Sequence, residues 1–101
     1  MAFAFHADSR VSAVVGTHTH VQTADETILP EGTAYISDVG MTGPSLSVIG
    51  MEVEPIVQKF KDAVPKRFGV AKSPAQLNGV YIEMDSETGK AIKIERVFER
   101  A

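Results

Sequence analysis

Two histidines separated by one residue are the first candidates for metal chemistry in this sequence. His18 and His20 follow directly after the apolar segment 11–16. Neutral imidazole is the commonest metal ligand in proteins, and open α/β sheets bind ligands beyond the carboxyl ends of their strands. Side chains at i and i+2 of an extended backbone lie on one face, so the pair can serve one ion or two adjacent ions. The spacing alone leaves two interpretations open, metal ligands or ordinary exposed loop histidines.

Three polar residues close to this pair have two readings each. Asp38 ends a second apolar segment, where it could orient a metal-bound imidazole or could simply form a turn. Thr17 and Thr19 flank the histidines and could donate hydrogen bonds to ligand oxygens. Threonines beside a strand end more commonly satisfy backbone groups.

Composition limits what can surround these residues. The chain has 101 residues, of which 44% are hydrophobic, so we expect one small domain, residues 1–101. The net charge of −3, with basic residues scattered along the chain, argues against a strong nucleic-acid surface. There is no cysteine, so any metal ligands must be histidines and carboxylates. No apolar run approaches the roughly 20 residues that a membrane-spanning helix needs, and we expect a cytoplasmic protein that does not engage membranes.

The hydrophobic pattern mixes the periods of helices and strands. Segment 11–16 is β-branched and almost continuously apolar, which is typical of a strand covered on both faces. Residues 53–64 place apolar side chains at i, i+3, i+4 and i+7, with Pro55 in the first turn, which predicts an amphipathic helix. The expected elements are helical turns at 1–7, strands at 11–16 and 33–40, a loop at 40–52, a helix at 53–64, a short strand around Phe68 and Val70, and an antiparallel hairpin from 80–85 and 92–95. Together they predict a layered α/β domain.

Two longer sequence runs resemble those of a known protein family. RVSAVVGTHTHVQTAD and GTAYISDVGMTGP resemble the YmdB-type branch of the calcineurin-like metallophosphoesterases, and the resemblance extends more weakly through the helix and the hairpin. It implies the C-terminal portion of a two-layer sheet sandwich with flanking helices, in which a mixed sheet is followed by an antiparallel hairpin. It also implies a pair of divalent ions (Fe, Mn or Zn) that hydrolyse phosphodiesters, including cyclic nucleotides. By this resemblance His18 is a ligand of one ion and His20 a ligand of the other.

The same resemblance suggests groups around the phosphate. It brings the glycine-rich loop near the mouth of the site, where backbone N–H groups of Met41, Thr42 and Gly43 could face phosphate oxygens, although ordinary loop chemistry explains these residues equally well. Thr17 and Thr19 would be further contacts to substrate. No catalytic residue can be assigned, because the family's other ligand motifs have no counterpart here.

The missing motifs define a second hypothesis. We expect residues 1–101 to be the C-terminal part of such an enzyme, which binds few or no metal ions by itself, and the alternative to an enzyme is a non-catalytic fragment that folds by self-association. His6, in the run FHAD, imitates one family motif, but its spacing to His18 is too short, and we expect a histidine on a helix surface. A strand 11–15 without a neighbour on one side would be an apolar edge, which favours a homo-oligomer.

Overall fold

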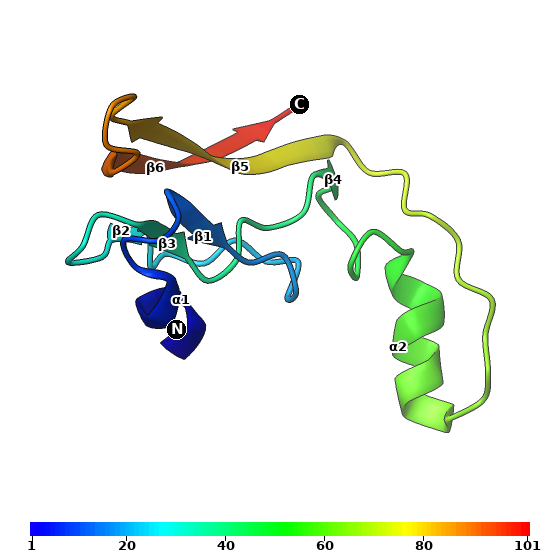
Figure 1. The fold of residues 1–101 in the computed structure, drawn as a ribbon. Helices are drawn as coiled ribbons and strands as arrows, with labels where there is room; N and C mark the ends of the chain where they lie inside the picture. The colour runs from blue at the N-terminus through cyan, green and yellow to red at the C-terminus, as the bar shows by residue number, and fades with distance from the viewer. The chain divides into compact units, whose positions relative to one another are not determined.

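The chain forms two compact units, which the computed structural model describes over all residues from Met1 to Ala101. Unit 1 comprises residues 1–41 and 78–98, and unit 2 comprises residues 42–77 and 99–101. In chain order the elements are α1 (Ala2–Ala7), β1 (Ala13–Val15), β2 (Thr27–Ile28), β3 (Ala34–Ile36), β4 (Gly43–Pro44), α2 (Val53–Asp62), β5 (Ala75–Met84) and β6 (Ala91–Arg100) (Figure 1). The expectation of a single domain stays a prediction.

A small mixed sheet forms the centre of unit 1. Its strand order is β1-β3-β2, with β1 parallel and β2 antiparallel to β3. The central strand β3 is buried along its whole length. Its residues Ala34, Tyr35 and Ile36 therefore anchor the sheet, and the expected mixed sheet is confirmed.

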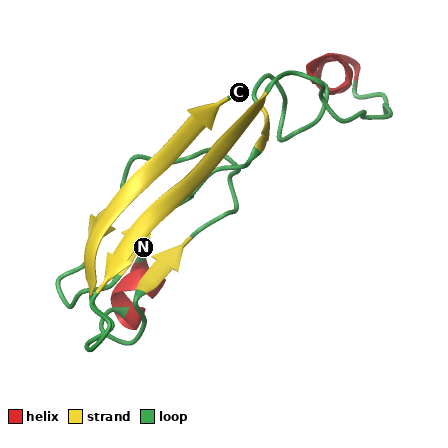
Figure 2. Ribbon diagram, turned by 90° about the horizontal axis from the view of Figure 1, so that it is seen from above, coloured by secondary structure: helices red, strands yellow, loops and turns green.

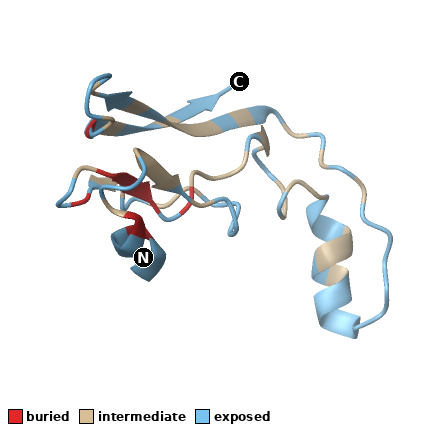
Figure 3. Ribbon diagram, viewed as in Figure 1, coloured by how far each residue is buried: buried red, intermediate tan, exposed pale blue.

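The core of unit 1 lies between α1 and this sheet. Ala4, Leu29 and Tyr35 are buried together, and Val14 packs against them. The small side chain of Ala4 lets the short helix approach closely, and burial is concentrated in α1, β3 and the adjoining turns (Figure 3). On the other side of the sheet lies the hairpin of β5 and β6, whose paired strands run in opposite directions (Figures 1 and 2).

Strand β1 differs from the expectation that both of its faces are covered. Val15, its last residue, is 44% exposed, and Val11, two residues before the strand, is 45% exposed. The reason lies in the strand order, because β1 is at the edge of its sheet and pairs with β3 alone. The prediction of complete burial is wrong, whereas the expected edge position is confirmed.

Unit 2 carries the longer helix. The predicted helix over 53–64 is observed as α2, which ends at Ala63 in a left-handed conformation with φ of 56°. Its apolar stripe is present, but no residue of α2 is buried, and Phe60 is 87% exposed. Before it, β4 pairs antiparallel with β5 through Gly43 and Gln76. Neither α1 nor α2 is long and apolar enough to cross a membrane.

Three short features differ from the sequence-based expectations. The prediction of a strand around Phe68 and Val70 is wrong, since Val70 forms only an isolated bridge with Met51. Strands β2 and β4 are additional, and each has two residues. The expected hairpin is confirmed and longer than predicted, and its turn closes through Gly89, whose φ is 74°.

Candidate functional site

The loop that carries the two histidines begins at Gly16, at the carboxyl end of β1. The Gly16 N–H donates to the carbonyl of Ile36 at 3.2 Å, and the Gly16 carbonyl accepts from the Val39 N–H at 2.9 Å. A Cβ atom at residue 16 would overlap the carbonyl oxygen of Ser37. Only glycine therefore lets the loop leave β1 in contact with the end of β3.

Asp38 holds this loop in place. It lies immediately beyond β3 and is 1% exposed. Its Oδ2 accepts the Thr19 N–H at 2.6 Å and the Thr19 hydroxyl at 2.8 Å, and its Oδ1 accepts the Gly40 N–H at 2.8 Å. A further hydrogen bond comes from the backbone N–H of His20. Asp38 therefore orients the backbone of the loop and forms a turn at the end of β3, which is one of its two readings from sequence.

These hydrogen bonds keep Asp38 ionised. Burial alone would raise its pKa, but the donors of Gly40, Thr19 and His20 more than offset that effect and bring the pKa below the ordinary 3.8. A buried carboxylate with this many donors is a fixed negative charge beneath the loop. It favours cations bound above it.

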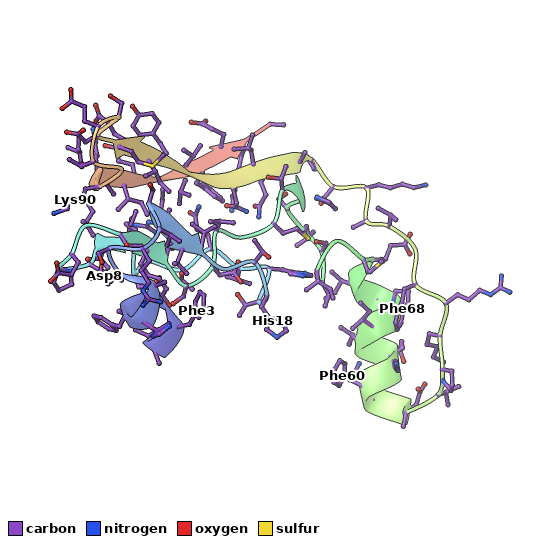
Figure 4. All side chains as sticks on the ribbon, in the orientation of Figure 1. Phe3, Asp8, His18, Phe60, Phe68 and Lys90 are labelled. Atoms are coloured by element: carbon purple, nitrogen blue, oxygen red, sulfur yellow. The ribbon has the colours of Figure 1, made fainter.

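The histidine side chains themselves are exposed. His20 has a left-handed backbone, with φ of 65°, so the chain turns sharply at the second histidine. Neither imidazole makes a hydrogen bond or an ion pair. Figure 4 shows His18 projecting from the loop away from the sheet. Both rings are thus available to an external ligand.

The donor set fits a divalent first-row metal ion only in part. Free imidazole nitrogens suit Zn and Fe, and a protein site normally supplies three or four ligands. No three histidine, aspartate or glutamate side chains of the chain lie close enough together to hold one ion. His18 and His20 can each contribute one ligand, and their assignment to two ions stays a prediction.

The four residues predicted to contact substrate lie in two different parts of the fold. Thr17 is exposed in the loop, while the Thr19 hydroxyl is engaged with Asp38 and lies 3.2 Å from the Val21 carbonyl. Thr42 and Gly43 belong to unit 2, and Gly43 is part of β4. Thr19 therefore positions the loop, and contacts of any of the four with substrate stay predictions.

Gln22 is a positioning residue that sequence reasoning missed. Its Nε2 lies 3.3 Å from the Val39 carbonyl, 3.0 Å from that of Gly79 and 3.1 Å from that of Val97. The side chain thus ties the end of the histidine loop to the segment after β3 and to both strands of the hairpin. No local sequence pattern predicts such a contact, because Gly79 and Val97 are far from Gln22 along the chain.

A second missed group supports the loop from the other side. Asp25 accepts hydrogen bonds from the Ser37 N–H at 3.1 Å and from the Thr23 hydroxyl at 2.6 Å, and it makes a very short contact with the Ser37 hydroxyl. The Ser37 hydroxyl also lies 3.0 Å from the Tyr35 hydroxyl. The hydrogen bond from the Ser37 side chain, followed by that from Thr23, lowers the pKa of Asp25 to about 2.

A cleft of about 260 Å³ lies elsewhere in unit 1. Its walls come from the segment between α1 and β1, the turn before β3 and the turn of the hairpin, and they include Arg10, Glu31 and Lys90. None of the predicted ligand residues lines it. The histidine loop therefore lies outside this cleft.

Relatives of known sequence and structure show which family the chain belongs to. Residues 1–97 match the family model of the YmdB-like proteins. The chain belongs to the YmdB-like family. The expected fold class is confirmed as well, because the structure is mixed α/β with two small sheets and matches solved structures of longer chains.

Three relatives show how far the similarity extends. The chain is 57% identical, over 97 residues, to the 2′,3′-cyclic-nucleotide 2′-phosphodiesterase of Bacillus subtilis strain 168, and the match covers 96% of this chain and 37% of that protein. The crystal structure of a novel phosphatase from Mycoplasma pneumoniae matches 98% of this chain and 36% of its own, with a TM-score of 0.93 and 46% identity. A hypothetical protein from Thermus thermophilus matches 99% of this chain and 39% of its own, with a TM-score of 0.91 and 41% identity. The chain spans somewhat more than a third of the length of these relatives.

Proposed function

We propose that this chain carries the histidine loop of a metal-dependent phosphodiester hydrolase, with His18 and His20 as ligands of two adjacent divalent ions. The observation that carries the proposal is the geometry around Asp38. A buried carboxylate fixes the backbone of the loop, while both imidazoles stay free and exposed. Membership in a family with a relative named as a cyclic-nucleotide phosphodiesterase supports a phosphodiester or cyclic-nucleotide substrate.

Each residue of the loop has a distinct part in this proposal. His18 and His20 hold the metal, while Thr19 and Asp38 fix the backbone between them. A divalent ion, when bound, stabilises negative charge on phosphate oxygens as a Lewis acid. The Thr17 hydroxyl is proposed to donate a hydrogen bond to the phosphate oxygens.

We also propose that the chain alone does not complete the reaction. Two imidazoles leave most positions around two ions without a protein ligand, and no third carboxylate or histidine lies within reach. The alternative function is therefore that of a non-catalytic part of the enzyme, folded through self-association. A cytoplasmic location for either form stays a prediction.

Metal binding and turnover separate these two functions. The purified chain is titrated with Mn²⁺ or Zn²⁺ in a calorimeter, and we expect weak binding that His18→Ala and His20→Ala each reduce further. His6→Ala is the matched control, because His6 lies exposed on α1, and this variant should bind as the unsubstituted chain does. If His6→Ala reduces binding as much as His18→Ala, the loop is not the metal site.

The same preparations are assayed on bis-p-nitrophenyl phosphate and on 2′,3′-cyclic AMP. We expect no turnover above that of the metal alone. Turnover that His18→Ala and His20→Ala abolish would instead show a complete site in this chain and would contradict the proposed incompleteness.

A further inference from the structure

The cleft of about 260 Å³ in unit 1 is bounded by three segments that backbone hydrogen bonds hold together. The Ala91 N–H donates to the Gly32 carbonyl at 2.7 Å and joins the hairpin to the turn before β3. The Ala34 N–H donates to the Ser12 carbonyl at 3.0 Å and joins β3 to the segment before β1. The walls are distant from one another in sequence, but they are fixed relative to one another, and all of them belong to unit 1.

Asp8 fixes the walls on the side of α1. Its Oδ2 accepts the Glu31 N–H at 2.8 Å. Its Oδ1 accepts the N–H groups of Ser9 and Thr33, each at 3.1 Å. Figure 4 shows Asp8 and Lys90 at the same end of unit 1. Asp8 itself does not line the cleft, so it shapes the walls and leaves the interior to other side chains.

Three charged side chains line the cleft, and none of them is paired. Arg10 and Lys90 are cations and Glu31 is an anion, and no ion pair or side-chain hydrogen bond engages any of the three. The Lys90 stem lies against Gly32, where a Cβ atom would come within 2.9 Å of the Lys90 Cγ, so the missing side chain gives the lysine its place. Two cations against one carboxylate leave a net positive charge, although the whole chain carries −3. The cleft therefore favours an anion.

Hydroxyl groups add hydrogen-bond donors to the two cations. Ser9, Ser12 and Thr88 also line the cleft. The hydroxyls of Ser9 and Ser12 make no hydrogen bond within the chain, and a Cβ atom at Gly89 would lie 3.5 Å from the Ser12 Oγ, so that hydroxyl faces the hairpin turn. The Thr88 hydroxyl accepts the Lys90 N–H at 3.2 Å and keeps its own proton to donate. A tetrahedral oxyanion, with several acceptor oxygens, matches such a set of donors.

The size of the cleft and its one carboxylate narrow the choice of anion. A volume of about 260 Å³ is below the roughly 300–1,000 Å³ of pockets for drug-sized ligands, so the cleft suits a small ion. The ionised Glu31 carboxylate only accepts hydrogen bonds, so it repels an oxyanion that carries no proton. A phosphate group loses its second proton at a pKa of about 6 and can donate a P–O–H to Glu31 before it does so. Sulfate has no such proton.

We propose that this cleft binds a small phosphate oxyanion that still carries a proton, either inorganic phosphate or the phosphate group of a small monoester. Arg10 and Lys90 contact its charged oxygens, the hydroxyl groups donate to the same oxygens, and Glu31 accepts the phosphate proton in a hydrogen bond. The site shares no residue with the histidine loop and does not rest on the proposed function.

Titration with inorganic phosphate near pH 6, at constant ionic strength and without added metal, tests the site. Amide chemical shifts of the ¹⁵N-labelled chain follow the binding by NMR. We expect saturable shifts at residues 9–12, 31–32 and 88–90, with a dissociation constant in the millimolar range, and unchanged amides at residues 17–20. The absence of saturable shifts, or shifts confined to residues 17–20, would overturn the proposal.

Replacement of the two cations tests their part in binding. Arg10→Gln and Lys90→Gln should each raise the phosphate dissociation constant at least about five-fold, because each removes a charged donor. Both side chains are exposed, so the fold should be kept. Lys93→Gln is the matched control, because Lys93 is on the same hairpin but pairs with Glu95 at 2.9 Å and does not line the cleft. If Lys93→Gln weakens binding as much as Lys90→Gln, the effect is one of overall charge and the site is wrong.

Sulfate tests the part assigned to Glu31. The unsubstituted chain should bind sulfate at least about five-fold more weakly than phosphate, because sulfate cannot donate to Glu31. Glu31→Gln should remove most of this difference, since an amide also donates. Equal binding of the two anions by the unsubstituted chain would overturn the proposed selectivity.

Two other small molecules separate the remaining ligands. Methyl phosphate that binds as tightly as inorganic phosphate would show that the site takes monoesters, whereas much weaker binding would restrict it to the free ion. Glycine offers a carboxylate to the cations and an ammonium group to Glu31. Saturable shifts at the cleft with glycine and none with phosphate would contradict the proposal and assign the cleft to a zwitterion.

Discussion

Replacing Asp38 by asparagine should destabilise the chain far more than its small change in shape suggests. The carboxylate accepts hydrogen bonds from two directions, from Thr19 at Oδ2 and from Gly40 at Oδ1. An asparagine has one acceptor oxygen, so its NH₂ group must face donors on one side. Leaving one buried donor unpaired costs about 1–3 kcal/mol, and the loss of charge weakens the remaining bonds by about 1 kcal/mol each. We expect a loss of roughly 3 kcal/mol in the free energy of unfolding.

Thermal unfolding at fixed protein concentration, followed by circular dichroism, measures this loss. For a domain of this size, about 3 kcal/mol corresponds to a fall of more than about 10 °C in Tm. Asp62→Asn is the matched control, because Asp62 is exposed at the end of α2, where its carboxylate pairs with Lys66 at 3.3 Å and accepts the Val64 N–H at 2.9 Å. Such an exposed pair contributes about 1 kcal/mol or less. If the two variants lose the same amount, Asp38 does not hold the loop as argued.

The pH dependence gives a second measure of Asp38. Burial raises the pKa of this carboxyl group, but its hydrogen bonds outweigh burial and place the pKa in the folded chain below the ordinary 3.8. The stabilisation is therefore fully present above the ordinary pKa and is lost as the pH falls through the pKa of the folded state. Asp38→Asn should show a shallower loss of stability in acid than the unsubstituted chain. An equally steep acid limb would assign that limb to other carboxylates.

Two further predictions concern the supports of the loop. Gly16→Ala should severely destabilise unit 1, because the added Cβ would overlap the Ser37 carbonyl. Gly79→Ala is the control and should be tolerated, since open space surrounds that position. Urea unfolding compares the two variants, and equal midpoints would refute the steric argument. Ser37→Ala should raise the pKa of Asp25 from about 2 toward its ordinary 3.8, as measured by NMR titration of the carboxyl group. The stabilisation from Asp25 is present above the ordinary pKa and lost as the pH falls toward 2, so this variant should also unfold at a higher pH in acid, and an unchanged titration would remove Ser37 as the cause.

The sequence predicts the elements that have a clear period and the loop that has a clear motif. The stripe from Val53 to Phe60 predicts α2 because four apolar residues repeat at helical spacing, and the alternation of Val80 and Ile82 predicts the hairpin in the same way. Strand β2 has only two residues, Thr27 and Ile28, which is too short for any period to appear. Its place in the sheet comes from pairing with β3.

Burial and distant contacts are harder to predict from sequence. The apolar run around Val14 predicts a strand but not how far its side chains are covered, because that depends on what packs against the sheet. Asp38 and Thr19 are recognisable as candidates, but their mutual hydrogen bonds depend on how the ends of β1 and β3 meet. No sequence pattern marks Gln22 as a positioning residue, since the hairpin residues that it contacts are distant in the sequence.

The contacts of Gln22 also set an order of events during synthesis. The histidine loop is complete only when the carbonyls of Gly79 and Val97 are in place, and Arg96 adds an ion pair to Glu26 at 2.7 Å. A nascent chain that has exposed its two histidines to solvent must still wait until residue 97 has left the ribosome before the loop acquires its final anchors. If His18 and His20 bind metal as proposed, ions that arrive earlier would meet them on a segment that still lacks these anchors.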